Sequence, residues 1–166
     1  MAHLITNELS NYVLEELGTQ GLGVNPNLDI PTPELPTDIT LLGDEDLMVL
    51  YTHFVIFSDF VNTQLSCAVI DEKELDRQLS GLESAKMMKY TASAGAKASV
   101  TAVKALVEDD EDIRKLKIQH LQKYAYRKML ETLANNSERD SAVCSRELTR
   151  RTSGDNFKTR SRKFNV

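Results

Sequence analysis

The sequence lacks tryptophan, and its 166 residues include only seven glycines, four prolines and two cysteines. Few residues therefore interrupt a helix. The apolar residues are mainly Leu, Ala, Val and Met, and they do not alternate with polar residues as β-branched and aromatic side chains do in strands. This composition predicts helices. A chain of this length favours one compact domain with tails.

The sequence also lacks a clustered set of metal ligands. Cys67 and Cys144 lie far apart and belong to no C-x-x-C motif, so they form neither a zinc knuckle nor a disulfide framework. Reduced thiols in the cytoplasm are the simplest interpretation. His3, His53 and His120 lack the i, i+4 spacing of a metal site on a helix. We therefore expect no metal and no cofactor.

Motifs that would indicate an enzyme are missing as well. Residues 18–23 read G-x-x-G-x-G, but no strand is predicted before them and no helix-opening lysine follows, so turns explain the glycines. The acidic run 108–112 matches no EF-hand loop, and acids at a helix start are explained by the helix dipole. Since an enzyme would need a site assembled from scattered residues, we expect a non-catalytic protein.

The pattern of apolar residues predicts an all-α fold, an irregular helical bundle with a long C-terminal helix. Residues 1–43 are predicted to form a short helix and an extended, proline-rich linker. The bundle domain is predicted over 44–152. Residues 153–166 are predicted to form a basic, flexible tail.

Individual helices are predicted from spacing and capping. A first helix is expected over 5–17, with Gly18 as its C-cap residue. Asp44 is expected to cap the next helix, in which apolar residues recur every three or four positions up to Leu65. Another is expected from near Asp71 to about Tyr90, because its first turn is acidic. The last is expected over about 109–151, with a weak segment over 91–97 before it.

The most apolar stretch, residues 47–70, requires a separate decision between a core helix and a membrane span. His53, Asp59, Asn62 and Gln64 interrupt it, and each of these side chains is costly in hydrocarbon. We therefore predict a core helix and no membrane partner.

Charge is unevenly distributed along the chain. Residues 1–138 carry 12 Lys/Arg against 22 Asp/Glu, whereas residues 139–166 carry 8 against 3. A basic segment next to an acidic body is a pointer to a polyanionic partner, although solubility and self-association are other uses of the same pattern.

The basic residues form two sets. The internal set lies around the weak segment and consists of Lys86, Lys89, Lys97 and Lys104. Tyr90 and Tyr126 are the tyrosines that could stack on bases beside it. In the C-terminal set, Arg139, Arg146 and Arg150 fall on one helical stripe that could track a phosphate backbone. The alternative is that both sets pair with acidic side chains of the body. The candidate DNA-binding residues are Lys86, Lys89, Tyr90, Lys97, Arg146, Arg150 and Arg151.

The order of these segments resembles that of the UvsY-type phage recombination mediators. L-Y-T-H-F-V-I-F-S-D-F-V-N, over 50–62, is similar to the early helix of that family, and L-E-S-A-K-M-M-K-Y, over 82–90, to its basic second helix. Residues 107–151, which end in S-R-E-L-T-R-R, are similar to its long C-terminal helix. The first 43 residues and the segment after Thr152 have no counterpart.

The resemblance implies a bacteriophage protein of DNA recombination and DNA repair that acts in the host cell cytoplasm. It implies a homo-oligomer assembled through the C-terminal helices, with Lys86 and Lys89 contacting single-stranded DNA. It also implies contacts with a RecA-like recombinase and a single-strand-binding protein. The alternative interpretation is a phage structural, scaffolding or adaptor protein that acts through helix–helix contacts.

Overall fold

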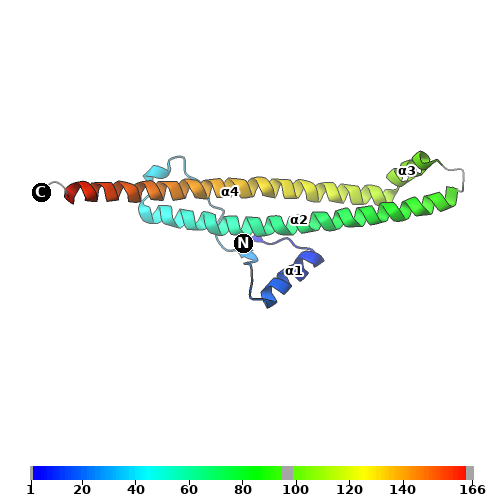
Figure 1. Cartoon of the computed structure of the whole chain (residues 1–166), viewed down its shortest axis with the longest axis horizontal. Helices are drawn as coiled ribbons and strands as arrows, with labels where there is room; N and C mark the ends of the chain where they lie inside the picture. Colours follow the sequence, from blue (N-terminus) through cyan, green and yellow to red (C-terminus); the bar gives the residue numbers. More distant parts are fainter. Residues whose placement is uncertain (1, 95–98, 164–166) are drawn as a thin grey trace. The chain divides into compact units, whose positions relative to one another are not determined.

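The structure, a computed structural model, describes residues 2–94 and 99–163, with side chains over 2–93 and 99–153. Most of these residues are helical, as predicted. Along the described residues the elements are β1 (Ala2–His3), α1 (Glu8–Thr19), β2 (Asn27–Leu28), the 3₁₀ turn η1 (Ile39–Leu41), α2 (Asp44–Ala94), α3 (Val100–Asp109) and α4 (Glu111–Lys163) (Figure 1).

The chain divides into two compact units, and both long helices contribute to each unit. Unit 1 consists of Met1–Leu4, Val24–Gln64 and Leu130–Val166. Unit 2 consists of Ile5–Gly23 and Leu65–Met129. In place of an irregular bundle, each unit is therefore built on a segment of α2 packed against a segment of α4 (Figure 1).

Unit 1 has an apolar core between antiparallel segments of α2 and α4. Asp44, at the start of α2, pairs with Arg151 of α4, and Asn62 donates a hydrogen bond to Glu138. Because the partner number falls as the α2 number rises, the two segments run in opposite directions. The core cluster consists of Leu47, Phe54 and Cys144, with Ile39, Leu42, Leu50, Tyr51 and Leu148 packed against it.

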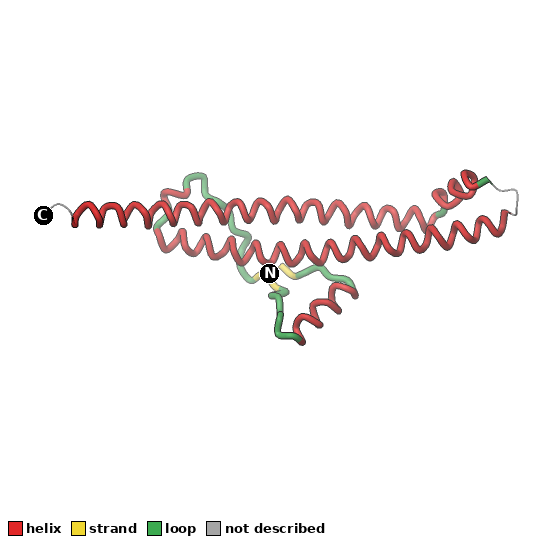
Figure 2. The backbone as a smooth tube through the Cα atoms, in the orientation of Figure 1, coloured by secondary structure: helices red, strands yellow, loops and turns green. Residues whose placement is uncertain are grey.

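The proline-rich segment completes unit 1. Among the described residues, 20–38 contain no helix, and all four prolines fall in this segment (Figure 2). β2 within it pairs antiparallel with β1, placing Ala2 opposite Leu28 and His3 opposite Asn27. Leu28 is buried, so one apolar side chain of the segment is part of the core.

Unit 2 is bridged mainly by charged side chains. Asp71 of α2 accepts hydrogen bonds from Ser10 of α1 and Lys123 of α4, and therefore joins three helices. Further along, Glu83 pairs with Lys117. The buried apolar residues of this unit are mostly small, and they are Cys67, Ala68, Val103, Val107 and Ile113.

Three helix boundaries differ from the predictions. α2 is continuous, so the predicted helix start at Asp71 is wrong; the acid is 4% exposed and neutralised by Lys123. Gly18 is not a C-cap residue, since α1 ends at Thr19 and Gly21 takes the positive φ of 76°. α3 is absent from the predictions, because the helix has only 10 residues and its apolar repeat is correspondingly brief.

The C-terminal segment, predicted as a basic, flexible tail, has a helical backbone. α4 continues past Thr152 to Lys163. Since Arg151 lies opposite Asp44, the first residue of α2, residues 152–163 continue beyond the start of α2 by about 18 Å at helical rise.

α2 is apolar enough over one 18-residue window to cross a membrane by length and composition alone. Core helices meet the same criterion. In unit 1 this helix buries Leu47, Phe54, Phe57 and Val61, which agrees with the predicted core helix.

Candidate nucleic-acid interface

Lys86 of the internal basic set lies in an ion-pair cluster in unit 2. Its Nζ is 2.8 Å from Asp110 Oδ2 and 2.8 Å from Asp112 Oδ2, and its side chain is 18% exposed. The hydroxyl of Tyr90 donates to Asp110 Oδ2 at 2.6 Å. The hydrogen bonds that Lys86 donates to Asp110 and Asp112 raise the pKa of Lys86. The hydrogen bonds that Asp110 accepts from Lys86 and Tyr90 hold the pKa of Asp110 well below its usual range.

Asp110 explains why the cluster forms there. It lies between α3 and α4, where its side chain accepts from the backbone N–H of Asp112 and its carbonyl accepts from that of Arg114. Such a residue satisfies amide groups that a helix start leaves unpaired. Lys86 and Tyr90 therefore hold the beginning of α4 against α2, a structural use of two residues predicted to contact DNA.

The other lysines of the internal set are placed differently. Lys89 is exposed, and no ion pair of its side chain occurs in the part of the chain that the structure describes. Lys104 on α3 is also exposed. Lys97 lies outside the described residues. Of this set, Lys89 and Lys104 have the exposure expected of a phosphate contact.

The side chain of Arg151, in the C-terminal set, is bound to other residues of unit 1. Its guanidinium pairs with Asp44 at 2.6 Å and Glu147 at 2.8 Å, and donates to the carbonyl oxygen of Leu42 at 2.9 Å. Its side chain is 18% exposed. These bonds fasten the end of η1 and the start of α2 to α4, and they leave little of the guanidinium for a ligand.

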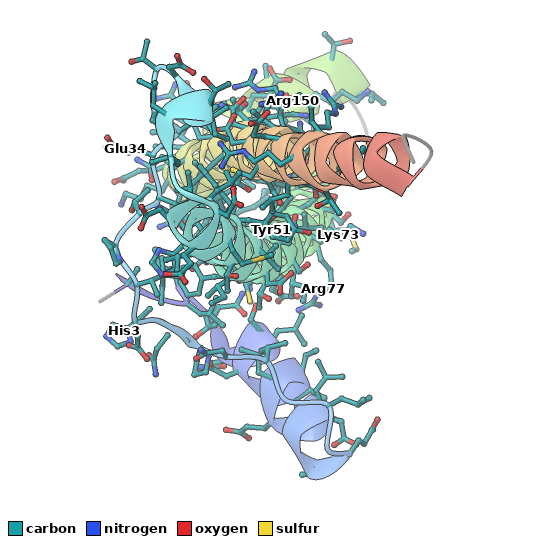
Figure 3. The ribbon with its side chains drawn as sticks, turned by 90° about the vertical axis from the view of Figure 1, so that its left-hand side faces the viewer. His3, Glu34, Tyr51, Lys73, Arg77 and Arg150 are labelled. Carbon is teal, nitrogen blue, oxygen red and sulfur yellow. The ribbon has the colours of Figure 1, made fainter. Side chains whose placement is uncertain are left out.

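Arg146 and Arg150 remain accessible four residues apart on α4. Arg150 pairs with Glu147 at 2.7 Å but keeps a side chain that is 66% exposed. Arg146 is exposed, and among the described residues it has no ion pair. Figure 3 shows Arg150 on the side of α4 that is turned away from Tyr51 of α2. The two cations therefore face solvent on the stripe predicted for Arg139, Arg146 and Arg150. Arg139 pairs with Asp140 and is also exposed.

The accessible arginines begin a strongly basic helical segment. Residues 146–163 carry seven Lys/Arg and two Asp/Glu, and the backbone is helical throughout. A helix with this charge can neutralise phosphates along an extended strand, an interaction that depends on salt and little on sequence.

Potential metal ligands and thiols are the remaining reactive groups to locate. Over residues 2–94 and 99–163, no group of three or more His, Cys, Asp or Glu side chains could hold a metal ion. Cys67 and Cys144 are free and buried, and burial raises the pKa of both thiols. Neither cysteine has the depressed pKa of a nucleophile.

Sequence reasoning missed the partners that fix Lys86 and Arg151. The acidic run 108–112 was interpreted as helix-dipole complementarity, which fits Asp110 but omits its ion pair. The available signal was a lysine near the end of one predicted helix and an acidic run at the start of the next.

Comparison with protein families, with curated proteins and with solved structures finds no match to this chain.

Proposed function

We propose that the protein is a non-catalytic recombination mediator that binds single-stranded DNA mainly through phosphate charge. The observation that carries this proposal is the basic end of α4, where Arg146 and Arg150 are accessible on a helix that continues to Lys163. Lys89 is a further candidate contact. Lys86, Tyr90 and Arg151 act through the fold, because protein partners already occupy their polar atoms.

The wider role rests on the resemblance to UvsY-type mediators. On this proposal the protein is a homo-oligomer in the host cell cytoplasm, and it helps to load a RecA-like recombinase onto DNA covered by a single-strand-binding protein. It requires no cofactor and no membrane.

Fluorescence anisotropy with a labelled oligothymidylate tests the proposal. Because counterion release drives phosphate binding, affinity should fall at least about tenfold between about 50 mM and about 200 mM salt. Absence of binding at the lower salt concentration would refute the proposal. Duplex DNA of the same length serves as the comparison, and a mediator should prefer the single strand.

A second candidate is a phage scaffolding or adaptor protein that acts through helix–helix contacts. It is favoured by exposed apolar side chains seven residues apart on α2, Met48 with Val55 and Val49 with Ile56. Capture of partners from nuclease-treated lysate separates the two candidates, since a scaffold keeps its protein partners when nucleic acid is removed. The oligomeric mass with and without single-stranded DNA shows whether assembly depends on the strand.

A further inference from the structure

Unit 2 contains a pocket of about 510 Å³ that the proposed phosphate contacts do not use. Pockets of roughly 300–1,000 Å³ hold small ligands. Residues of α2 and of α4, spaced three or four apart on each helix, line two sides of the pocket. Ile5 and Asn7, which precede α1, line a third side. The lining includes Asp71, Glu74, Leu75, Gln119, Gln122 and Tyr126.

The charged groups of the pocket are already paired. Asp71 accepts from Ser10 Oγ at 3.1 Å and from Lys123 Nζ at 2.8 Å. Glu74 accepts from Arg77 and Gln78. An anionic ligand would meet these two carboxylates, and a cation would have to displace the groups bound to them. The pocket is therefore suited to a neutral ligand.

The polar groups of the pocket that remain available to a ligand are mainly side-chain amides. Gln119 and Gln122 are exposed, and within the described chain neither side chain has a hydrogen-bond partner. Leu75 and the ring of Tyr126 supply apolar surface. Burial raises the pKa of Tyr126 above its usual value. Two free amides beside an aromatic ring suit a planar ligand with hydrogen-bond donors and acceptors on its edge.

We infer that this pocket binds a nucleobase, an assignment that rests on the proposed function. Glutamine amides make paired hydrogen bonds to base edges, and bases stack on aromatic side chains. A peptide also presents neutral amides, but a nucleobase carries its donors and acceptors on the edge of the same rigid ring that stacks on an aromatic side chain. The pocket would thus add a base contact to a strand held elsewhere by its phosphates.

Titration of the full chain with free adenosine and thymidine, followed by amide NMR shifts, tests the assignment. Saturable shifts are expected for residues 71–78 and 119–126. The double variant Gln119→Ala with Gln122→Ala should weaken nucleoside binding about tenfold, because two hydrogen bonds are lost. Asn136→Ala removes an exposed amide elsewhere on α4 and should change nothing. Absence of saturable shifts would overturn the assignment, as would shifts at these residues with a short peptide alone.

An abasic oligonucleotide separates this assignment from the proposed function. The Gln119/Gln122 variant should bind an ordinary strand more weakly and the abasic strand like the unmodified protein. If strands bind but nucleosides do not, the pocket assignment fails and the proposed function stands. If nucleosides bind but strands do not, the proposed function fails and the pocket assignment stands.

Discussion

The two units hold the same pair of helices by different physical means. In unit 1 the buried contacts are large and apolar, with Leu47, Phe54 and Phe57 on α2. In unit 2 the helices are bridged by ion pairs such as Asp71–Lys123 and Glu83–Lys117. Apolar burial depends little on salt, whereas ion pairs lose strength as salt screens them. The units should therefore respond differently to mutation, pH and salt.

The structure also separates bound cations from accessible ones. In unit 2, Lys86 and Lys123 join helices. In unit 1, Arg151 joins helices in the same way, whereas Arg146 and Arg150 face solvent. A polyanion should consequently bind the basic end of α4 in preference to the lysine cluster around Lys86.

The largest expected effect is on the apolar core of unit 1. Phe54 is 2% exposed, so Phe54→Ala should lower the free energy of unfolding by about 3–5 kcal/mol. The adjacent Val55, which is 37% exposed, provides the control, and Val55→Ala should cost under about 1 kcal/mol. Urea denaturation measures both. Equal losses would show that Phe54 does not carry the core.

A smaller loss is expected from the charged junction of unit 2. Asp71→Ala removes the acceptor for Ser10 and Lys123, and should lower the free energy of unfolding by about 2–3 kcal/mol. Hydrogen exchange in α1 should rise at the same time. Lys115→Ala removes an exposed pair and should stay within about 0.5 kcal/mol. If α1 keeps its protection in Asp71→Ala, the junction does not hold it.

Unit 1 also has a titrating contact at the edge of its core, at Glu147. Hydrogen bonds from Arg150 and Arg151 lower the pKa of Glu147 from 4.5 to about 2. Because the folded state favours the ionised form, this stabilisation is present above pH 4.5 and is lost as the pH falls towards 2.

Melting temperatures between pH 7 and pH 2 test this contact, with Glu147→Gln as the comparison. The variant should melt lower at pH 7 and lose less on acidification than the unmodified protein. Parallel curves for the two proteins would contradict the role given to Glu147.

The smallest expected effect is that of salt on local stability. Exposed pairs contribute little individually, so 1 M NaCl should reduce hydrogen-exchange protection only modestly. The reduction should fall on unit 2, around Glu83 and Lys117, and spare the residues around Phe54. A uniform change in both units would remove the distinction between them.

Much of the fold could be predicted from the sequence. Apolar residues that recur every three or four positions predict the helix that begins at Asp44 and the helix that contains Arg151, because the buried face of a helix needs that spacing. The continuity of α2 at Asp71 could not be predicted, since an acid at a helix start and an acid buried against Lys123 look alike in sequence. α3 is too short to give a clear repeat.

The candidate site was predictable to a lesser degree. Helical spacing correctly placed Arg146 and Arg150 on one accessible stripe. It could not identify which cations already have partners, because Arg151 meets Asp44 across 107 residues of chain, and Lys86 meets Asp112 across 26. Such pairs depend on how the two long helices align, and a single sequence does not specify that alignment.

The most direct measurement compares single-stranded DNA binding by the double variant Arg146→Gln with Arg150→Gln, and by Lys86→Gln. Anisotropy titrations across salt concentrations give affinity and salt dependence together. The arginine variant should bind at least about fivefold more weakly at low salt, and its salt slope should decrease by about 1.4, since two phosphate contacts are lost. Lys86→Gln should keep the slope of the unmodified protein. A reduced slope for Lys86→Gln, with the arginine variant unchanged, would contradict the assignment of the polyanion contact to α4.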